Sequence, residues 1–280
     1  MVTMDRSFTR LHNRWAFDGV LTLQSALHVG GGESRTLASD SPIIRDALGR
    51  PFLPGSTLKG AMRAAVERLV PVVGSQRGLT CCGLSPREER CPTPAGSPAY
   101  EAVDRALREF AGTPGERQEQ LLPLLEERLC ASCRLFGSPW LAGRVYVADA
   151  LPADADTPVE IRDGVGIDRD AGTAREQTRY SYEAIPALTS FTFRLEAENV
   201  DDTDLALLGV ALGELQRGAL RLGSGASRGL GACRLELQQV RSIRLDGAAP
   251  ALLAYLRDGT MEIHTPTEWL EQATSWLFAG

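Results

Sequence analysis

The stretch "LTSFTFRLEAENV", residues 188–200, alternates apolar and polar side chains more cleanly than any other part of the chain. A period of two residues is typical of a β-strand with one buried face. A run with helical spacing follows at residues 203–217. A strand leading into a helix is therefore the unit from which we build the fold.

Three other segments extend this unit. The runs "WAFDGVLTLQSAL" at 15–27 and "GRVYVADALP" at 143–152 also predict strands. A helix is expected to begin at Pro54-Gly55-Ser56, because the apolar residues behind that turn recur at helical spacing: Leu58, Met62, Val66 and Leu69. No predicted strand runs into a G-x-G-x-x-G turn, which disfavours a dinucleotide-binding fold. We expect one α+β domain over residues 1–280, a ferredoxin-like sheet with helices on one side.

The composition is that of an ordinary globular protein, with 43% hydrophobic and 24% charged residues among 280. A membrane span needs roughly 18 or more apolar residues, and no such run occurs. The first residues, "MVTMDRSFTRLHNRW", lack the apolar core of a secretory signal, so we expect a cytoplasmic protein without a membrane partner. The net charge of −6 argues against a protein coated in nucleic acid, although it permits a local basic stripe.

Five of the six cysteines fall within residues 71–135, which read as an insertion with a helical stretch at about 99–129. Clustered cysteines in a cytosolic protein are more often metal ligands than disulfides. The C-x-x-C at Cys130 and Cys133 is half of a zinc site, and Cys91 with either Cys81 or Cys82 supplies the other half. Cys233 lies in a predicted strand and is expected to be a core residue.

Two further segments carry arginines in a polar context. Residues 153–185 have no sustained apolar period and are expected to form a long hairpin, with six notable residues: Arg162, Arg169, Arg175, Arg179, Tyr180 and Tyr182. The glycine-rich "LGSGASRGLG" at 222–231 carries Arg228 and would let backbone amides approach a phosphate. It is not a nucleotide-binding Walker loop, because no Gly-Lys-Ser/Thr follows.

Four motifs together resemble one family. "LHVGGGES" at 27–34, "SDSPIIRDALGRPFLPGSTLKGAMR" at 39–63, "CRLFGS" at 133–138 and "LGSGASRGLG" occur in the order found in the RAMP superfamily of CRISPR-associated proteins. The chain is most similar to the backbone subunit of type III effector complexes, with a subtype III-D-like character, because related subunits also look zinc-bearing in the cysteine region.

This resemblance implies a modified RNA-recognition-motif fold that polymerises along a guide RNA (crRNA) with copies of itself and other effector subunits. The hairpin would be a thumb that wedges into the guide–target duplex, with Val165 and Ile167 as wedge candidates. The resemblance also implies that target RNA is cut with Mg²⁺ or Mn²⁺ by the aspartate of the "SDSP" motif, Asp40. A carboxylate there can hold a metal and orient a 2′-hydroxyl for attack. Asp46 and Glu33 are nearby, and we expect both to be solvated.

The resemblance also predicts the RNA contacts. The helix after Pro54 offers free N–H groups at its start and places Lys59 and Arg63 on one face, where a guide phosphate would fit. His28 borders the expected RNA channel, and the glycine-rich loop would lie against the guide. The predicted RNA-binding residues are His28, Ser56, Lys59, Arg63, Arg162, Arg169, Arg179, Gly223, Ser227 and Arg228.

Two alternatives stay open. The first is a non-catalytic backbone subunit that displays target RNA to a separate nuclease. The second is a metal-independent, guide-processing endonuclease that uses a histidine base, and it is disfavoured because only His28 of three histidines lies near a suitable loop. Structural Zn²⁺ in the insertion is compatible with each of these readings.

Overall fold

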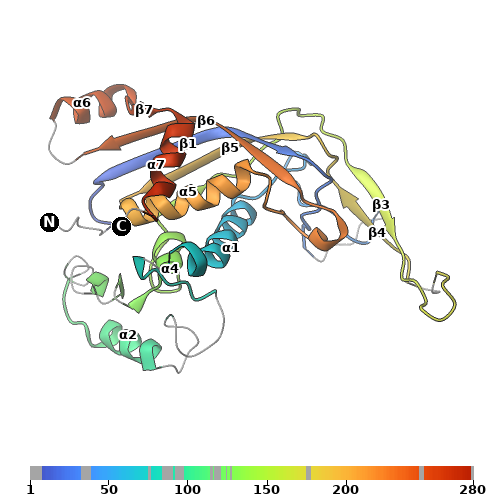
Figure 1. The fold of residues 1–280 in the computed structure, drawn as a ribbon, viewed down its shortest axis with the longest axis horizontal. Coiled ribbons are helices and arrows are strands. Elements are labelled where there is room, and N and C mark those ends of the chain that lie inside the picture. The colour runs from blue at the N-terminus through green and yellow to red at the C-terminus, as the bar shows by residue number, and fades with distance from the viewer. Residues whose placement is uncertain are drawn as a thin grey trace.

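A computed structural model gives the fold of the chain (Figure 1). It describes eleven stretches: residues 8–32, 39–74, 77–83, 91, 98–113, 116, 121–123, 125–126, 128–174, 178–245 and 249–278. Glu33 and Arg175, both named in the sequence analysis, lie outside the described residues. Within these stretches, no helix is both long and apolar enough to cross a bilayer.

The fold is α+β and is built on an antiparallel sheet of five strands in the order β2-β5-β1-β6-β7. The strands are β1 (Asn13–Leu23), β2 (Val145–Val147), β5 (Ser190–Glu198), β6 (Cys233–Arg244) and β7 (Glu262–His264). The central strand β1 pairs with both β5 and β6, and a bulge at Asp18/Gly19 shifts the register with β6. The alternation at 188–200 is confirmed as β5, whose residues Phe191, Phe193, Leu195 and Ala197 are buried.

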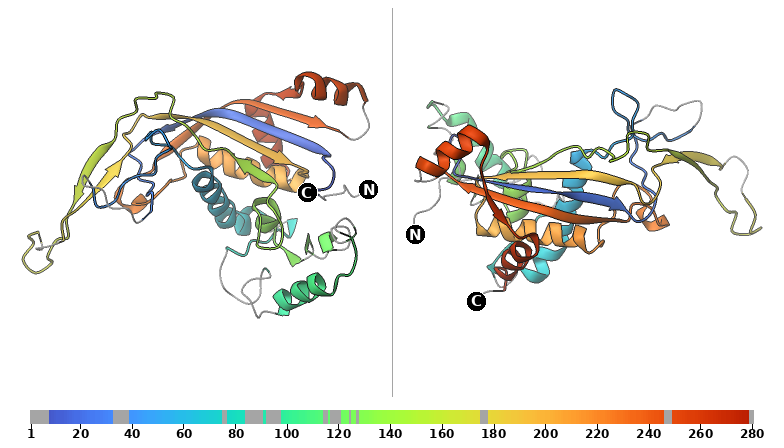
Figure 2. Two further views of the ribbon diagram at one scale, coloured as in Figure 1. Left: turned by 180° about the vertical axis from the view of Figure 1, so that it is seen from behind. Right: turned by 90° about the horizontal axis from the view of Figure 1, so that it is seen from above.

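Three long helices lie on one side of the sheet: α1 (Gly55–Val73), α5 (Asp202–Gln216) and α7 (Pro266–Ser275) (Figures 1 and 2). Helix α5 begins at a capping box in which the Asp201 carboxylate accepts from the Asp204 amide and Asp204 accepts from the Asp201 amide. The apolar face of α1 packs into the main core, as its spacing predicts, with Leu58, Met62 and Val66 fully buried. Burying apolar area of this extent between sheet and helices is the main source of stability.

The segment between α1 and β2 forms a smaller second body around α2 (Pro98–Glu109), whereas α4 (Ala131–Phe136) packs into the main core through Ala131, Leu135 and Phe136. The helix expected over about 99–129 is interrupted, because α2 ends at Glu109 and the sequence continues Gly112-Thr113-Pro114-Gly115, which favours a turn. Four cysteines and Val103, Leu122, Leu125, Leu129 and Leu141 form a hydrophobic cluster separate from the main core.

A two-stranded hairpin of β3 (Glu160–Gly164) and β4 (Tyr180–Ala184) projects from the body (Figure 1). It lies at the opposite end of the molecule from the chain termini. The C-terminal region adds α6 (Ala249–Asp258), the short edge strand β7 and α7. The sequence analysis expected a helical or partly ordered tail there, so β7 is an addition to it.

Candidate nucleic-acid interface and metal centre

Asp40 lies beside the base of the hairpin. Its carboxylate oxygen Oδ2 accepts hydrogen bonds from the Ser181 amide at 2.9 Å and from the Ser181 hydroxyl at 3.2 Å. The Asp40 amide in turn donates to the Ser181 hydroxyl at 3.2 Å. The hydrogen bonds from Ser181 hold this carboxylate in place, and because Asp40 is exposed, the carboxylate also faces solvent.

The neighbouring residues run alongside β4. Ser41 forms a parallel bridge with Tyr182, and the Glu183 amide donates to the Ser41 carbonyl at 3.0 Å. The Glu183 carboxylate, which is buried, accepts from the Ile43 amide at 3.1 Å and from Arg45 at 3.1 Å. The segment that carries Asp40 is therefore joined to the hairpin strand by both backbone and side-chain contacts.

His28, which is 7% exposed, contacts both β4 and the segment that carries Asp40. Its Nδ1 lies 2.6 Å from the Glu183 carbonyl, and its Nε2 lies 3.2 Å from the Ser41 hydroxyl. A carbonyl only accepts, so Nδ1 carries the proton and a neutral ring accepts from Ser41 at Nε2. With both ring nitrogens bonded inside the protein, His28 supports the site rather than acting as a free base.

A pocket of about 180 Å³ opens at this junction, lined by His28, Ser41, Tyr180, Tyr182, Ser224, Arg228 and Leu230. The Tyr180 and Tyr182 rings stack with centroids 6.2 Å apart and planes inclined by 29°. Arg228 donates to the Tyr180 hydroxyl at 2.7 Å. Tyr180 is exposed and Tyr182 is half-buried. An accessible aromatic face with a guanidinium beside it is suited to stacking on bases and contacting phosphates of single-stranded RNA.

The glycine-rich loop can pack closely against this pocket because two of its glycines lie where a side chain would clash with the backbone. Gly223 has φ +69°, and a Cβ there would lie 2.2 Å from the His28 carbonyl oxygen. Gly231 has φ +78°, and a Cβ there would meet the Leu222 carbonyl oxygen at 1.9 Å. The Ser224 amide donates to the His28 carbonyl at 2.9 Å. This close fit places Ser224 and Arg228 at the pocket, and Ser227 is exposed beside them in the same loop.

The predicted hairpin residues lie along the projecting strands. Arg179 pairs with Asp163 at 2.8 Å across the hairpin, and this hydrogen bond raises the pKa of Arg179. Arg162 pairs with Glu160 at 2.8 Å on its own strand. Arg169 is exposed near the turn, and the side chains of Val165 and Ile167 are 45% and 59% exposed. Exposed apolar side chains on a projecting hairpin are available to insert into another molecule.

Lys59 and Arg63 occupy a different environment from the one predicted. On the face of α1 where a guide phosphate was expected, both are half-buried under residues 137–145. Lys59 donates to the Val145 carbonyl at 2.8 Å, and burial lowers its pKa. Arg63 donates to the Gly137 carbonyl at 2.8 Å and pairs with Glu67 at 2.7 Å.

The start of α1 is also occupied by a protein group. The Asp149 carboxylate accepts from the Gly55 amide at 2.7 Å, where a phosphate was expected to sit. A carboxylate at a helix N-terminus takes the place of an external anion and repels a second one. Ser56 remains exposed, but the Asp149 carboxylate occupies part of the phosphate site that was expected at this helix start.

The cysteine segment brings four buried sulfurs together: those of Cys82, Cys91, Cys130 and Cys133. All four lie within 4.8 Å of one another, and the Cys82 and Cys133 sulfurs are 3.6 Å apart. A tetrahedral zinc ion with Zn–S bonds of about 2.3 Å places its sulfurs about 3.8 Å apart. The four side chains therefore fit a Cys₄ zinc site, in which Cys82 rather than Cys81 completes the set.

Hydrogen-bond donors surround these sulfurs. Arg63 donates to the Cys133 sulfur at 3.2 Å, and the Cys130 amide donates to the Cys91 sulfur at 3.2 Å. Contacts of this kind stabilise metal-bound thiolates. Hydrogen bonds with Cys133 lower the pKa of Cys130 to about 2, whereas a hydrogen bond with Cys130 raises the pKa of Cys91 to about 12. The hydrogen bond with Cys130 also raises the pKa of Cys133. One thiolate is thus favoured, and full ionisation of the cluster needs a cation.

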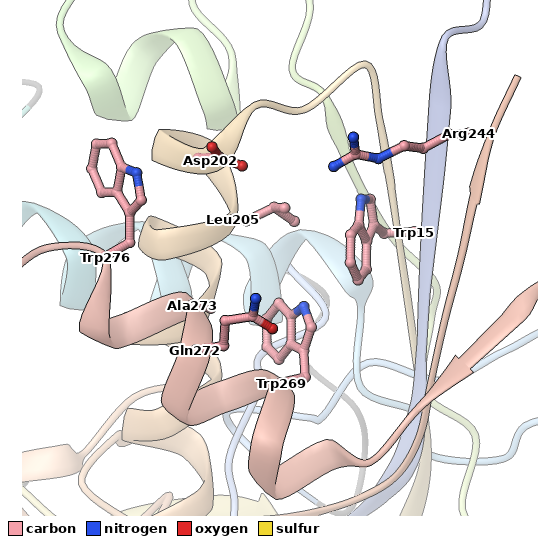
Figure 3. Close-up of a pocket in the computed structure, with 8 residues that line it drawn as sticks. All are labelled: Trp15, Asp202, Leu205, Arg244, Trp269, Gln272, Ala273 and Trp276. Carbon is pink, nitrogen blue, oxygen red and sulfur yellow. The ribbon is translucent and has the colours of Figure 1, made fainter. Parts of the chain in front are cut away.

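A separate pocket of about 220 Å³ lies between α5, α7 and the sheet (Figure 3). Trp15 and Trp269 form its aromatic floor with ring centroids 6.2 Å apart, and Trp276 stands across from Trp15. Its rim carries the charged side chains of Asp202 and Arg244. None of the predicted site residues lines it, so it is distinct from the hairpin-base pocket.

The structure also adds residues to the site that sequence reasoning missed. Ser181, Ser41 and Glu183 had no signal in the sequence, because their contacts join segments about 140 positions apart along the chain. A strand pattern over "YSYEA" at 180–184 would have placed Tyr180 and Tyr182 on one face, with Ser181 between them on the other. What Ser181 faces could be learned only from the fold.

The chain has several relatives among known proteins. It is 40% identical over 60 residues to the CRISPR system Cms endoribonuclease Csm3 of Methanocaldococcus jannaschii, which is 21% of this chain and 24% of that protein. It is 36% identical over 62 residues to the protein of the same name from Enterococcus italicus, covering 21% and 29%. It is 30% identical over 82 residues to the CRISPR system Cms protein Csm5 of Streptococcus thermophilus, covering 28% and 23%.

In each case the chain spans about a quarter of the length of the curated relative that it matches. The broader match is to a family model described as the RAMP superfamily, which covers residues 20–234. That range runs from β1 to the beginning of β6 and includes the hairpin, the cysteine cluster and the glycine-rich loop. Because the model matches most of the sequence, the chain belongs to the RAMP superfamily.

Proposed function

We propose that this protein is a backbone subunit of a type III CRISPR effector complex, which binds guide RNA and cuts complementary target RNA beside Asp40. The observation that carries the proposal is the junction of Asp40, the hairpin and the glycine-rich loop. It joins an exposed, fixed carboxylate to a pocket with aromatic and cationic walls. The relatives named endoribonucleases, although matched over short stretches, support the same reading.

In this proposal the five-stranded sheet is a modified RNA-recognition-motif core, and the β3–β4 hairpin is the thumb that enters the guide–target duplex. Tyr180, Tyr182 and Arg228 contact RNA at its base, and Arg162, Arg169 and Arg179 contact phosphates along it. Gly223 and Ser227 approach the backbone of the guide. Copies of the chain assemble side by side along the guide together with other effector subunits.

Cutting proceeds by attack of a 2′-hydroxyl on the adjacent phosphorus. The O2′–P bond forms and the P–O5′ bond breaks, the 2′-hydroxyl proton passes to solvent, and water protonates the leaving 5′-oxygen. The products are a 2′,3′-cyclic phosphate and a 5′-hydroxyl. Mg²⁺ or Mn²⁺, when bound, would neutralise charge developing on the phosphate. The Asp40 carboxylate, held by Ser181, would be a ligand of that ion, and the pocket next to it would receive the RNA.

We also propose that Cys82, Cys91, Cys130 and Cys133 hold a structural Zn²⁺. Four thiolates leave no open position for a substrate, which is the pattern of a structural site. The cluster lies at the centre of the second hydrophobic body, so metal binding and folding of this segment would be coupled.

A non-catalytic subunit is the alternative that one observation favours. In the described part of the chain, the cysteine cluster is the only close group of three or more potential metal ligands, and none gathers around Asp40. A subunit that only displays target RNA would bind RNA with the same pocket and leave cutting to another nuclease. A guide-processing enzyme with a histidine base is disfavoured, because both nitrogens of His28 are bonded internally.

The test is cleavage by the assembled complex. Complexes containing wild-type protein, Asp40→Ala or Asp202→Ala are loaded with guide and given complementary RNA and Mg²⁺. Asp202 is an exposed carboxylate in the separate aromatic pocket and serves as the matched control. We expect evenly spaced cuts from wild type and Asp202→Ala, and a loss of about a hundredfold or more in Asp40→Ala with guide binding retained. Intact target with wild type would favour the display-only subunit.

A further inference from the structure

Ser181 holds Asp40 through three contacts that cross 141 positions of the chain. Its amide and hydroxyl both donate to Oδ2 of Asp40, and the hydroxyl accepts from the Asp40 amide. Two donors that meet at one carboxylate oxygen fix both the position and the rotation of the group. An exposed carboxylate otherwise samples several rotamers.

The backbone around Asp40 is also tied to the hairpin, and the residues after it are tied to residues 29–31. Ser41 pairs with Tyr182 in a parallel bridge, and the Glu183 amide donates to the Ser41 carbonyl. Farther along, the Ile43 amide donates to the buried Glu183 carboxylate at 3.1 Å. A shift of β4 would therefore act first on Asp40 and Ser41, whereas Pro42 and Ile44 are also bonded to Gly31 and Val29.

The same strand faces the pocket with its alternate residues. Side chains in a strand point to opposite faces in turn, so Tyr180 and Tyr182 share one face and Ser181 lies between them on the other. The stacked tyrosine rings line the pocket, and Ser181 contacts Asp40. One short strand thus touches the expected path of the RNA on one side and the carboxylate on the other.

The hairpin that carries this strand is free to respond to a ligand. Its outer part projects from the body as a pair of strands (Figure 2), whereas its base is joined to the body by the Ser41–Tyr182 bridge and by buried Ala184. An isolated two-stranded hairpin is marginally stable in water. The outer part of this one exposes Ile161, Val165 and Ile167, and its Arg162 and Arg179 pair with acidic residues of the hairpin itself. Binding to a duplex would restrict it, and β4 would transmit that restriction to Asp40.

We propose that Ser181 is a positioning residue that couples seating of the hairpin on RNA to placement of the Asp40 carboxylate. The inference rests on the proposed function and specifies how its site is regulated. Ser181 does not touch the reacting atoms. It sets where the metal-binding carboxylate lies, so cutting depends on whether the hairpin is engaged.

The test compares three variants in the guide-loaded complex. Ser181→Ala removes the hydroxyl and keeps the amide, and Ser181→Thr restores a hydroxyl on a residue that strands favour. Thr178→Ala is the control, because it removes a side-chain hydrogen bond to Gly166 across the hairpin without touching Asp40. The measurements are kcat for cutting, target affinity and the Mn²⁺ concentration that gives half-maximal rate.

We expect Ser181→Ala to lower kcat about tenfold and to raise the half-maximal Mn²⁺ concentration, with target affinity unchanged. Ser181→Thr should recover most of the rate, and Thr178→Ala should leave the Mn²⁺ dependence unchanged. If Ser181→Ala cuts like wild type while Asp40→Ala does not cut, the coupling is wrong and the proposed function stands. If Thr178→Ala matches Ser181→Ala in all three measurements, Ser181 only stabilises the hairpin. A wild-type complex that does not cut overturns both proposals.

Discussion

Arg228 lines the pocket at the base of the hairpin, and contacts with neighbouring residues fix its position there. Arg228 lies within the glycine-rich loop, in which Gly223 has a left-handed conformation and lies against the His28 carbonyl. Its guanidinium donates to the Tyr180 hydroxyl on the hairpin. The guanidinium is therefore held between two elements and remains exposed. A fixed, exposed arginine loses less conformational freedom on binding a phosphate than a mobile one does.

We predict that Arg228→Ala weakens guide-RNA binding and flattens its salt dependence. Each phosphate contact to a single strand contributes about 0.7 to the slope of log K against log salt concentration, so the slope should fall by about that amount. Filter binding or fluorescence anisotropy at several salt concentrations measures it. The matched control is Arg257→Ala on α6, an arginine that is 80% exposed and pairs with Asp258. Equal slopes for wild type and Arg228→Ala would place the RNA elsewhere.

For single residues, the sequence predicted which residue types belong to a site better than it predicted what surrounds each side chain. The cysteines were chosen correctly as a group, and the structure brings together four of the five. Lys59 and Arg63 were expected to contact a guide phosphate, and residues 137–145 cover them in the structure, so that contact stays a prediction. Helical spacing fixes which face a side chain lies on, but it does not reveal what packs there. The roles of Asp40 and Arg228 stay predictions, with geometry that supports them.

Among the elements, the cysteine-bearing segment depends most on a single site. Its hydrophobic cluster is small and separate from the main core, and the cysteines lie within it. Small bodies with little buried apolar surface commonly need a metal or disulfides to fold. We therefore expect zinc to stabilise this segment while the five-stranded sheet keeps its own core.

We predict close to one Zn²⁺ per chain by elemental analysis of purified protein. Replacing Cys130 and Cys133 together by Ser should remove the metal and lower the melting temperature, because metal binding is coupled to folding. Cys81→Ala is the matched control and should retain the metal, since Cys81 is not among the four clustered sulfurs. Metal-free wild-type protein of full stability would contradict the assignment, and metal loss in Cys81→Ala alone would change its ligand set.

The zinc site should also release metal on acidification. Without a cation, a hydrogen bond with Cys130 raises the pKa of Cys91 to about 12, so Cys91 is a protonated thiol at neutral pH. Binding must displace that proton, and Zn²⁺ affinity therefore rises with pH and falls as pH is lowered. Chelator competition over a range of pH, together with measured proton release, tests the sign. Affinity independent of pH would mean that the ligands are already ionised.

The secondary structure was predicted well where alternation or helical spacing was strong. Strand β5 and helix α5 match their expected positions within two residues, because β5 buries one face in the main core and α5 is a long apolar helix buried on most sides. The helix expected through the cysteine segment is interrupted after Glu109, with residues 121–123 and 125–126 helical again, and the edge strand β7 was not foreseen. Strand β7 has three residues, which is too short for a period, and it pairs only with β6.

Over the whole molecule, the expected contacts with RNA gather at one end. The hairpin, the Asp40 segment and the glycine-rich loop meet beyond the end of the sheet that lies opposite the termini (Figure 1). The cysteine body lies on the helix side, away from this junction. Membership of the RAMP superfamily covers all of these parts, and the finer assignment to a target-cutting backbone subunit remains our proposal.

The order of the strands could not be read from the sequence. Alternation identifies strands but does not say which pair, and here β1 pairs with β5 and β6, which are distant along the chain. The pairing of the Asp40 segment with β4 is of the same kind, because it depends on the packing of the whole fold. The central claim, that RNA passes the base of the hairpin, follows from that long-range arrangement.

Cross-link mapping tests this claim most directly. The wild-type complex with guide and target RNA is irradiated, and the cross-linked peptides are identified by mass spectrometry. We predict cross-links at Tyr180 and Tyr182 and in the glycine-rich loop around Arg228, since these residues line one exposed pocket. Cross-links confined to the cysteine segment or to the aromatic pocket of Trp15 and Trp269, with the hairpin-base peptides unmodified, would contradict the account.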